Sequence, residues 1–91
     1  MRGTHALSQS TFNEALVFNQ DISSWDVGRV TSMRSVFFYA TSFNQDIRSW
    51  DTSSVYMMAY MFQFAASFDQ VLCWDVSSVD TYDMFSGSGT T

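Results

Sequence analysis

One segment of this chain recurs at a fixed spacing. It reads FNQDISSWDV from Phe18, FNQDIRSWDT from Phe43 and, in a degraded form, FDQVLCWDV from Phe68, with 25 residues between successive phenylalanines. A constant period of roughly 20 to 50 residues is typical of proteins built from stacked repeats. The sequence therefore predicts a tandem array in which each unit packs on its neighbours.

Aligning the repeats predicts a core of aromatic side chains that recur at equivalent positions. The predicted core residues are Phe37 and Phe62, then Phe18, Phe43 and Phe68, and finally Trp25, Trp50 and Trp74. We expect the indoles to face the core and not to form a carbohydrate-stacking surface, because they share a phase with Val27 and Val76. The third copy lacks one residue before Trp74, which indicates an atypical terminal repeat.

The pattern inside each unit predicts one strand, a turn, one short helix and a return loop. Apolar residues recur with helical periodicity from Val30 to Ala40 and again from Val55 to Ala65. Around Trp25 the period becomes two, as in a short strand with one buried face. We therefore predict an α/β repeat solenoid, leucine-rich-repeat-like, with about three strand-turn-helix units and a short parallel sheet.

Length and composition indicate one small domain. In the 91 residues we expect a disordered or capping segment over 1–11, the repeats over 12–85 and a frayed tail over 86–91. The N-terminus has no apolar segment typical of a secretory signal. The most apolar stretch, residues 55–66, is shorter than the roughly 20 residues that cross a bilayer, so no membrane span is predicted.

Charge and residue content argue against several classes of function. The net charge is −5 with only four Lys and Arg, which disfavours nucleic acid and anionic membranes as partners. A single cysteine, Cys73, excludes an internal disulfide framework. The only histidine, His5, lies outside the repeats, and no glycine-rich phosphate loop is present. We expect no enzyme activity, no cofactor and no metal centre.

Several elements of the repeat unit occur together: FNQDI and SWD, SSV with a methionine three residues on, and the Met-Phe pairs at Met61 and Met84. In these elements the unit resembles the repeat of the BspA-like surface proteins. Departures include Gly28-Arg29 in place of Ser-Ser, and Val71 in the last copy. The resemblance implies an extracellular or cell-surface, leucine-rich-repeat-like and non-enzymatic module associated with adhesion.

Two sets of residues are candidate binding sites. Asp26, Asp51 and Asp75 recur next to tryptophan, and each either accepts hydrogen bonds within its own turn or helps to bridge a calcium ion. Tyr56, Tyr60 and Phe64 are spaced four residues apart on the second predicted helix. They either pack on neighbouring helices or form an exposed aromatic patch suited to a protein interface.

Asn19, Asn44 and the related Asp69 are expected where the chain turns into the strand. An amide there can satisfy backbone groups.

The function predicted first is a non-enzymatic surface module that binds a protein ligand or mediates adhesion. The alternative is a structural solenoid whose ends, with unpaired backbone and exposed aromatic core, associate end to end into oligomers or filaments.

Overall fold

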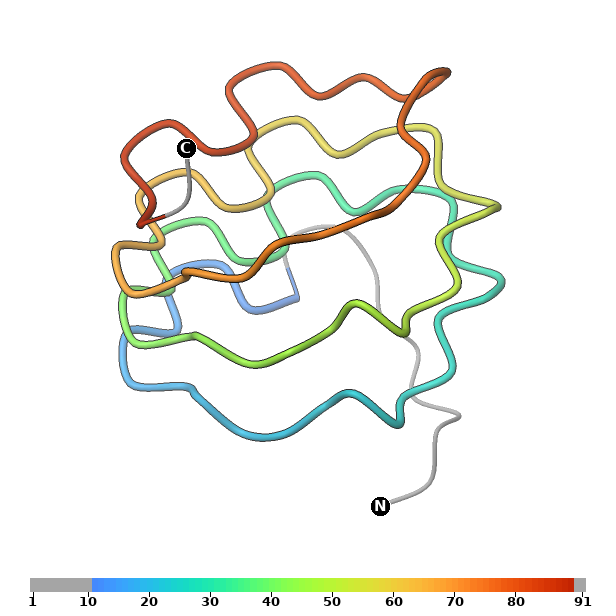
Figure 1. Cartoon of the computed structure of the whole chain (residues 1–91). Helices are drawn as coiled ribbons and strands as arrows, with labels where there is room; N and C mark the ends of the chain where they lie inside the picture. Colours follow the sequence, from blue (N-terminus) through green and yellow to red (C-terminus); the bar gives the residue numbers. More distant parts are fainter. Residues whose placement is uncertain (1–10, 90–91) are drawn as a thin grey trace.

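Residues 11–89 are described by a computed structural model, in which equivalent residues of successive repeats lie side by side (Figure 1). Each repeat begins with an extended segment at Phe18, Phe43 or Phe68, drawn in blue, green and orange, one above the other in the figure. The chain then turns a corner after the tryptophan and returns through a turn-rich segment. We call these returning segments, residues 12–17, 30–40, 55–65 and 79–87, the turn segments.

The predicted α/β solenoid of strand-turn-helix units is wrong. Over residues 11–89 the backbone contains no helix, and its only β pairing consists of two isolated parallel bridges, Ser32 with Met57 and Met57 with Asp80. Both bridges lie in the turn segments, where helices were expected, and not beside the tryptophans, where the sheet was expected. The same described part of the chain therefore holds no helix with the length and hydrophobicity needed to cross a bilayer.

Helices do not form because alternate N–H groups of one turn segment donate hydrogen bonds to carbonyl groups of the next turn segment. Phe37 N–H donates to the Met61 carbonyl at 2.9 Å, and Tyr39 N–H donates to the Gln63 carbonyl at 2.9 Å. The intervening Phe38 N–H closes a tight turn on the Ser35 carbonyl at 3.2 Å. An α-helix requires bonds from each N–H to the carbonyl four residues back, so this division of donors between repeats excludes it.

Left-handed backbone conformations also interrupt the helical path at regular positions. Ser35 and Tyr39 have φ of 59°, and their counterparts one repeat later, Tyr60 and Phe64, have φ of 61°. Glu14, Asp83 and Gly87 continue the series in the first and last turn segments. A left-handed residue costs roughly 1–2 kcal/mol when it is not glycine. We attribute the persistence of this conformation to the bonds between repeats.

The core consists of aromatic rings stacked in columns from repeat to repeat. Phe12, Phe37, Phe62 and Phe85 form one column, with ring centroids 5.4 to 5.5 Å apart. Phe18, Phe43 and Phe68 form a second column at 5.8 to 5.9 Å. Burying a large apolar side chain stabilises the fold by about 1.5–3 kcal/mol. These columns therefore bind the repeats to one another.

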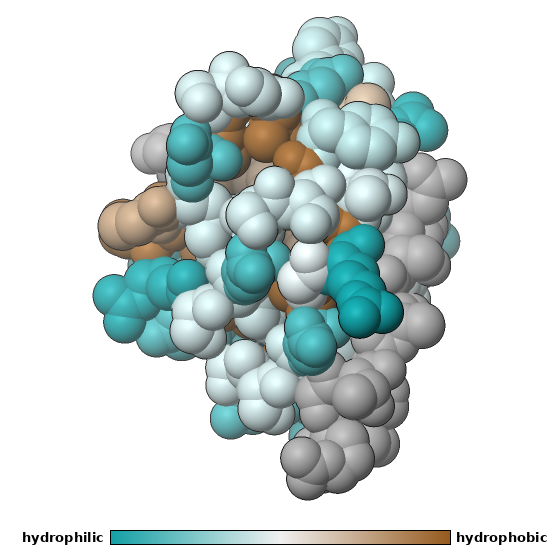
Figure 2. All heavy atoms as spheres, turned by 90° about the vertical axis from the view of Figure 1, so that its right-hand side faces the viewer, coloured by the Kyte–Doolittle hydropathy of each residue, from teal (hydrophilic) through white to brown (hydrophobic). Residues whose placement is uncertain are grey.

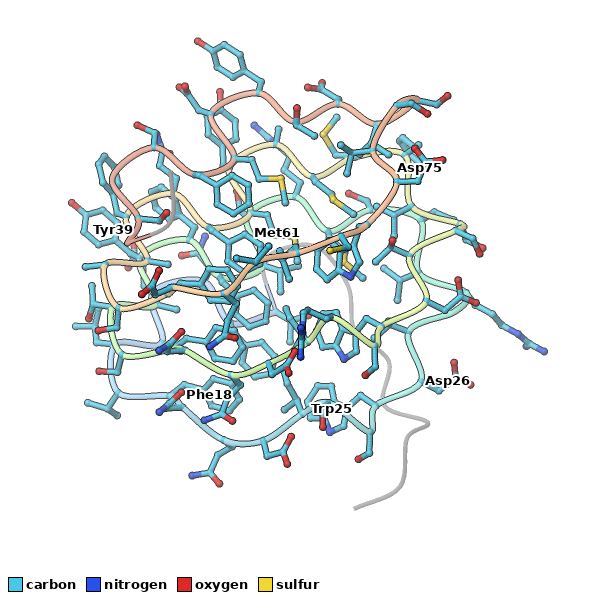
Figure 3. All side chains as sticks on the ribbon, in the orientation of Figure 1. Phe18, Trp25, Asp26, Tyr39, Met61 and Asp75 are labelled. Atoms are coloured by element: carbon cyan, nitrogen blue, oxygen red, sulfur yellow. The ribbon has the colours of Figure 1, made fainter. Side chains whose placement is uncertain are left out.

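Burial follows the predicted pattern even though the helices are absent. Phe37, Phe43, Phe62 and Phe68 are fully buried, and Trp50 is 4% exposed. The remaining predicted core residues, Phe18, Trp25 and Trp74, are half-buried and pack against this core. They belong to the first and third repeats, each of which has one neighbouring repeat within residues 11–89. Figure 3 shows Phe18 and Trp25 in the lowest part of the stack and Met61 in its interior.

An asparagine ladder joins the extended segments. Asn19 Oδ1 accepts the N–H of Asn44 at 2.8 Å, and Asn44 Oδ1 accepts the N–H of Asp69 at 2.8 Å. Gln45 and Gln70 add side-chain bonds to the same two oxygens. The expectation that these amides satisfy backbone groups is confirmed, and the groups belong to the next repeat.

The third repeat departs from this regularity at its tryptophan. Trp50 Nε1 donates to the carbonyl of Ile22 in the preceding repeat at 3.1 Å. Trp74 Nε1 is buried and has no hydrogen-bond partner among residues 11–89. The third copy lacks one residue before Trp74. We attribute the unpaired indole N–H to this shortening, because it changes the register between Trp74 and the repeat before it.

Candidate functional site

The three predicted aspartates lie at the corner that follows each tryptophan. Asp26 Oδ1 accepts the N–H of Gly28, Asp51 Oδ1 that of Ser53, and Asp75 Oδ1 that of Ser77, each at 3.0 Å. Figure 3 shows Asp26 and Asp75 on the same side of the molecule. Each carboxylate is thus engaged by a donor two residues further along the chain, which is the Asx-turn arrangement.

Hydrogen bonding lowers the pKa of Asp51 and Asp75. The backbone and hydroxyl groups of Ser77 lower the pKa of Asp75, and those of Ser53 lower the pKa of Asp51, the hydroxyl having the larger effect there. Bonds that favour the charged form of a carboxyl group lower its pKa. The same effect acts on Asp21 through Ser23, and on Asp46 through Arg48, whose guanidinium lies 3.0 Å from it.

The corner does not assemble the aspartates into a metal centre. Among residues 11–89, no three His, Cys, Asp or Glu side chains gather closely enough to hold a metal ion. A cleft of about 530 Å³ does separate the corners of the second and third repeats, and both Asp51 and Asp75 line it. Figure 2 views this side of the molecule and shows mainly pale and teal side chains, with brown apolar atoms visible between them. The turn bonds give each of these aspartates a local structural role.

The predicted aromatic set of Tyr56, Tyr60 and Phe64 is divided by the structure. No helix forms over these residues, and within residues 11–89 no ring contact joins any two of them. Tyr56 is 60% exposed. Tyr60 and Phe64 each contact aromatic residues of neighbouring turn segments instead.

Tyr60 is the centre of a cluster that crosses three turn segments. The Arg34 guanidinium carbon lies 5.3 Å from the centroid of the Tyr60 ring, a cation–π distance. On its other side, the Tyr82 ring meets Tyr60 edge to face at 5.6 Å. We call Arg34, Tyr60 and Tyr82 the tyrosine cluster. Tyr82 is 63% exposed, so the cluster opens to solvent at its last member.

Phe64 belongs to a separate group at the opposite corner. Its ring lies 4.8 Å from Tyr39 and 6.0 Å from Phe38, and Figure 3 shows Tyr39 on the side of the molecule away from Asp26 and Asp75. Gly87 closes this group, since a Cβ built on it would lie 2.5 Å from the Phe64 ring. This contact makes the Phe64 ring part of the packing between turn segments.

Sequence reasoning missed Arg34 and Tyr82 as members of an aromatic site. In the repeat alignment both occupy the position just before the left-handed residues Ser35 and Asp83. The repeat alignment could have placed Arg34 and Tyr82 at equivalent positions. The prediction of a helix instead pointed to residues spaced four apart within one segment. His5, the only histidine of the sequence, lies outside the described residues.

Comparison with known proteins identifies a family. A family model described as "Mycoplasma protein of unknown function, DUF285" matches residues 6–91, nearly the whole chain, and the chain therefore belongs to that family. Neither the curated proteins nor the solved structures contain a significant match.

Proposed function

We propose that this member of the DUF285 family is a non-enzymatic module that binds a protein ligand through the tyrosine cluster. The observation that carries the proposal is the contact series from Arg34 through Tyr60 to Tyr82, which brings together side chains from three turn segments. Tyrosine and arginine are enriched among the residues that dominate protein interfaces. Tyr82 offers a large ring with few rotatable bonds, so its immobilisation costs little entropy.

Charge supports a protein partner of particular composition. The chain carries a net charge of −5, and complementary charge accelerates association and selects partners. We therefore propose a ligand segment that combines a hydrophobic or aromatic anchor with basic residues. The anchor packs on Tyr82, and the basic residues of the ligand complement the net negative charge of the chain.

We further propose that the module acts at the cell surface in adhesion. The support is the resemblance of the FNQDISSWDV unit and its Met-Phe partner to the BspA-like repeat. Antibody staining of intact and permeabilised cells tests this location. Staining that requires permeabilisation contradicts it.

The binding proposal is tested with a random peptide library displayed on phage and panned on the immobilised full-length chain. Enriched peptides are then measured against Tyr82→Ser and Tyr56→Ser. The two variants make the same chemical change at positions that are 63% and 60% exposed, and only Tyr82 belongs to the cluster. We expect Tyr82→Ser to weaken binding at least about tenfold, or ~1.4 kcal/mol.

The control variant Tyr56→Ser should bind the same peptides within about twofold of wild type, because a residue outside the contact centre contributes little. Circular dichroism melts of both variants verify that neither substitution unfolds the chain. Equal weakening by the two variants, no weakening by either, or a library that yields no enriched peptide would each contradict the proposed site.

A further inference from the structure

We propose that the protein ligand of the tyrosine cluster carries an Asp or Glu side chain near its anchor, and that Arg34 binds this carboxylate. The inference rests on the proposed function and specifies the chemistry of the partner at the same site. It concerns the turn segment 30–40, which lies between two other described turn segments, 12–17 and 55–65.

Arg34 presents a guanidinium that no carboxylate of the described chain holds. The residue is exposed, and the one ion pair within residues 11–89 joins Arg48 to Asp46. The residues outside that range include no Asp or Glu. A guanidinium is a planar fork of donors that fits a carboxylate through two parallel hydrogen bonds. Although the net charge is −5, the charge at this position therefore favours an acidic group of the ligand.

The Arg34 guanidinium is held in place before any ligand binds. Its carbon lies 5.3 Å from the centroid of the Tyr60 ring. Next to it, Ser35 N–H donates to the Ala59 carbonyl at 3.1 Å. Tyr60 N–H donates in turn to the Tyr82 carbonyl at 3.0 Å. Because these bonds fix the three turn segments of the cluster side by side, less conformational entropy is lost when a carboxylate binds.

The site suits a carboxylate side chain better than the free C-terminus of a ligand. Terminal carboxylates are typically captured by groups of backbone N–H donors. In the cluster, the N–H groups of Ser35 and Tyr60 are used between turn segments, and the N–H of Arg34 lies 3.4 Å from Ser32 Oγ, its acceptor. The Arg34 guanidinium therefore supplies the donors for the ligand's carboxylate.

The spacing within the cluster defines a spacing within the ligand. The Tyr60 ring contacts both the Arg34 guanidinium, at 5.3 Å, and the Tyr82 ring, at 5.6 Å. The guanidinium lies no further from the Tyr82 ring than these two contacts together span. Since an extended peptide rises about 3.3 Å per residue, we expect the acidic residue two or three positions from the anchor that packs on Tyr82.

The two ends of the cluster differ in charge. Arg34 is at one end, whereas the exposed residues Asp80 and Asp83 flank Tyr82 in the sequence at the other. Asp80 Oδ1 also accepts the N–H of Tyr82 at 3.1 Å. Complementary charge therefore favours the acidic residue of the ligand beside Arg34 and its basic residues beside Tyr82.

The test is a double-mutant cycle on the peptides that the wild-type chain enriches from the random library. In each peptide the acidic residue is replaced by the corresponding amide, and both forms are measured against wild type, Arg34→Gln and Arg29→Gln. Arg29 provides the matched control, because it is also exposed and belongs to no ion pair within residues 11–89. The two variants change the net charge equally, and only Arg34 contacts Tyr60.

We expect the amide peptides to bind wild type and Arg29→Gln at least about fivefold more weakly than the acidic peptides, but Arg34→Gln within about twofold. Arg34→Lys keeps the charge without the planar fork, so its preference for the acidic form should be intermediate. A disturbance of the Tyr60 ring by Arg34→Gln would weaken both forms of the peptide alike, and the cycle separates it from loss of the ion pair. Circular dichroism verifies that the variants remain folded.

The outcomes distinguish this inference from the proposed function. Enriched peptides that require Tyr82 but contain no acidic residue would overturn the inference and leave the proposed function standing. The same holds if the amide form loses equal affinity for wild type and Arg34→Gln. A library without peptides that depend on Tyr82 would overturn both.

Discussion

Asn44 Oδ1 accepts the backbone N–H of Asp69 at 2.8 Å, one repeat further along the chain. The same oxygen accepts Nε2 of Gln70 at 2.9 Å, and Asn19 makes the equivalent pair of bonds to Asn44 and Gln45. One amide oxygen therefore holds two groups of the next repeat. The repeats are registered by these polar contacts as well as by their rings.

Substitution of Asn44 should separate the contribution of this ladder from that of the core. We expect Asn44→Ala to lower the free energy of unfolding by about 1–2 kcal/mol, because two donors of the third repeat lose their acceptor. Asn44→Asp keeps an acceptor oxygen and should lose much less. Urea unfolding followed by tryptophan fluorescence measures both, and equal losses in the two variants would refute the ladder's role.

The position of a ring within its column should determine the cost of its removal. Phe37→Ala is expected to destabilise the chain by about 3–5 kcal/mol, since the ring is fully buried between Phe12 and Phe62. Phe12→Ala, at the half-buried end of the same column, should cost clearly less. Calorimetric melts of the two variants provide the comparison, and a greater cost at Phe12 would argue against stacking as the main source of stability.

Acid should weaken the fold through the corner and extended-segment aspartates. Hydrogen bonds to Ser23, Arg48, Ser53 and Ser77 lower the pKa of Asp21, Asp46, Asp51 and Asp75 below 3.8 in the folded chain. The folded state then binds fewer protons than the unfolded state, so the stabilisation is complete above about pH 4 and is lost as pH falls through the lowered values.

The variant in which these four aspartates become asparagine isolates that effect. Asparagine still offers Oδ1 to the turn N–H groups but does not titrate. We expect its free energy of unfolding to vary less between neutral and acidic pH than that of wild type. Parallel pH dependences for the two proteins, measured by urea unfolding, would show that other groups control acid stability.

Substitutions at two residues with left-handed backbone conformation should change the stability in opposite directions. Gly87→Ala should destabilise by about 1–3 kcal/mol, because φ is 76° and the new Cβ would lie 2.5 Å from the Phe64 ring. Ser35→Gly should stabilise by up to about 1 kcal/mol, since φ is 59° and glycine adopts it without strain. Thermal melts detect both shifts. Stabilisation by Gly87→Ala would contradict the described backbone at that position.

The sequence predicts which residues of the repeat are buried better than it predicts the backbone conformation. Met33, Val36, Phe37 and Ala40 are all buried, as their spacing indicates. A series of tight turns with left-handed residues at Ser35 and Tyr39 buries residues at intervals of three and four, which is also what an amphipathic helix does. Hydrophobic spacing alone does not distinguish the two, because the deciding bonds run between segments far apart in sequence.

The sequence indicates the local turn bonds of the aspartates but not the contacts of the tyrosine cluster, because those contacts join segments that are far apart in sequence. The aspartates recur beside tryptophan, and their local turn bonds follow from an Asp two residues before a donor. The tyrosine cluster depends on which side chains meet between segments, as Arg34 and Tyr60 do. Such contacts require the register between repeats, and the lost residue before Trp74 changes that register in a way the alignment alone does not quantify.

The spacing of bonded turn segments limits how the length of this chain can change. The bonded residues are 24 apart from Phe37 to Met61 and 22 apart from Phe62 to Met84, close to one repeat in both cases. Excising residues 30–54, one full period, would join Arg29 to Val55 and place Phe12 and Phe18 opposite Phe62 and Phe68. Removing half as many would take the phenylalanine columns out of register. Whole-unit duplication or loss is therefore the kind of genetic rearrangement that this architecture tolerates.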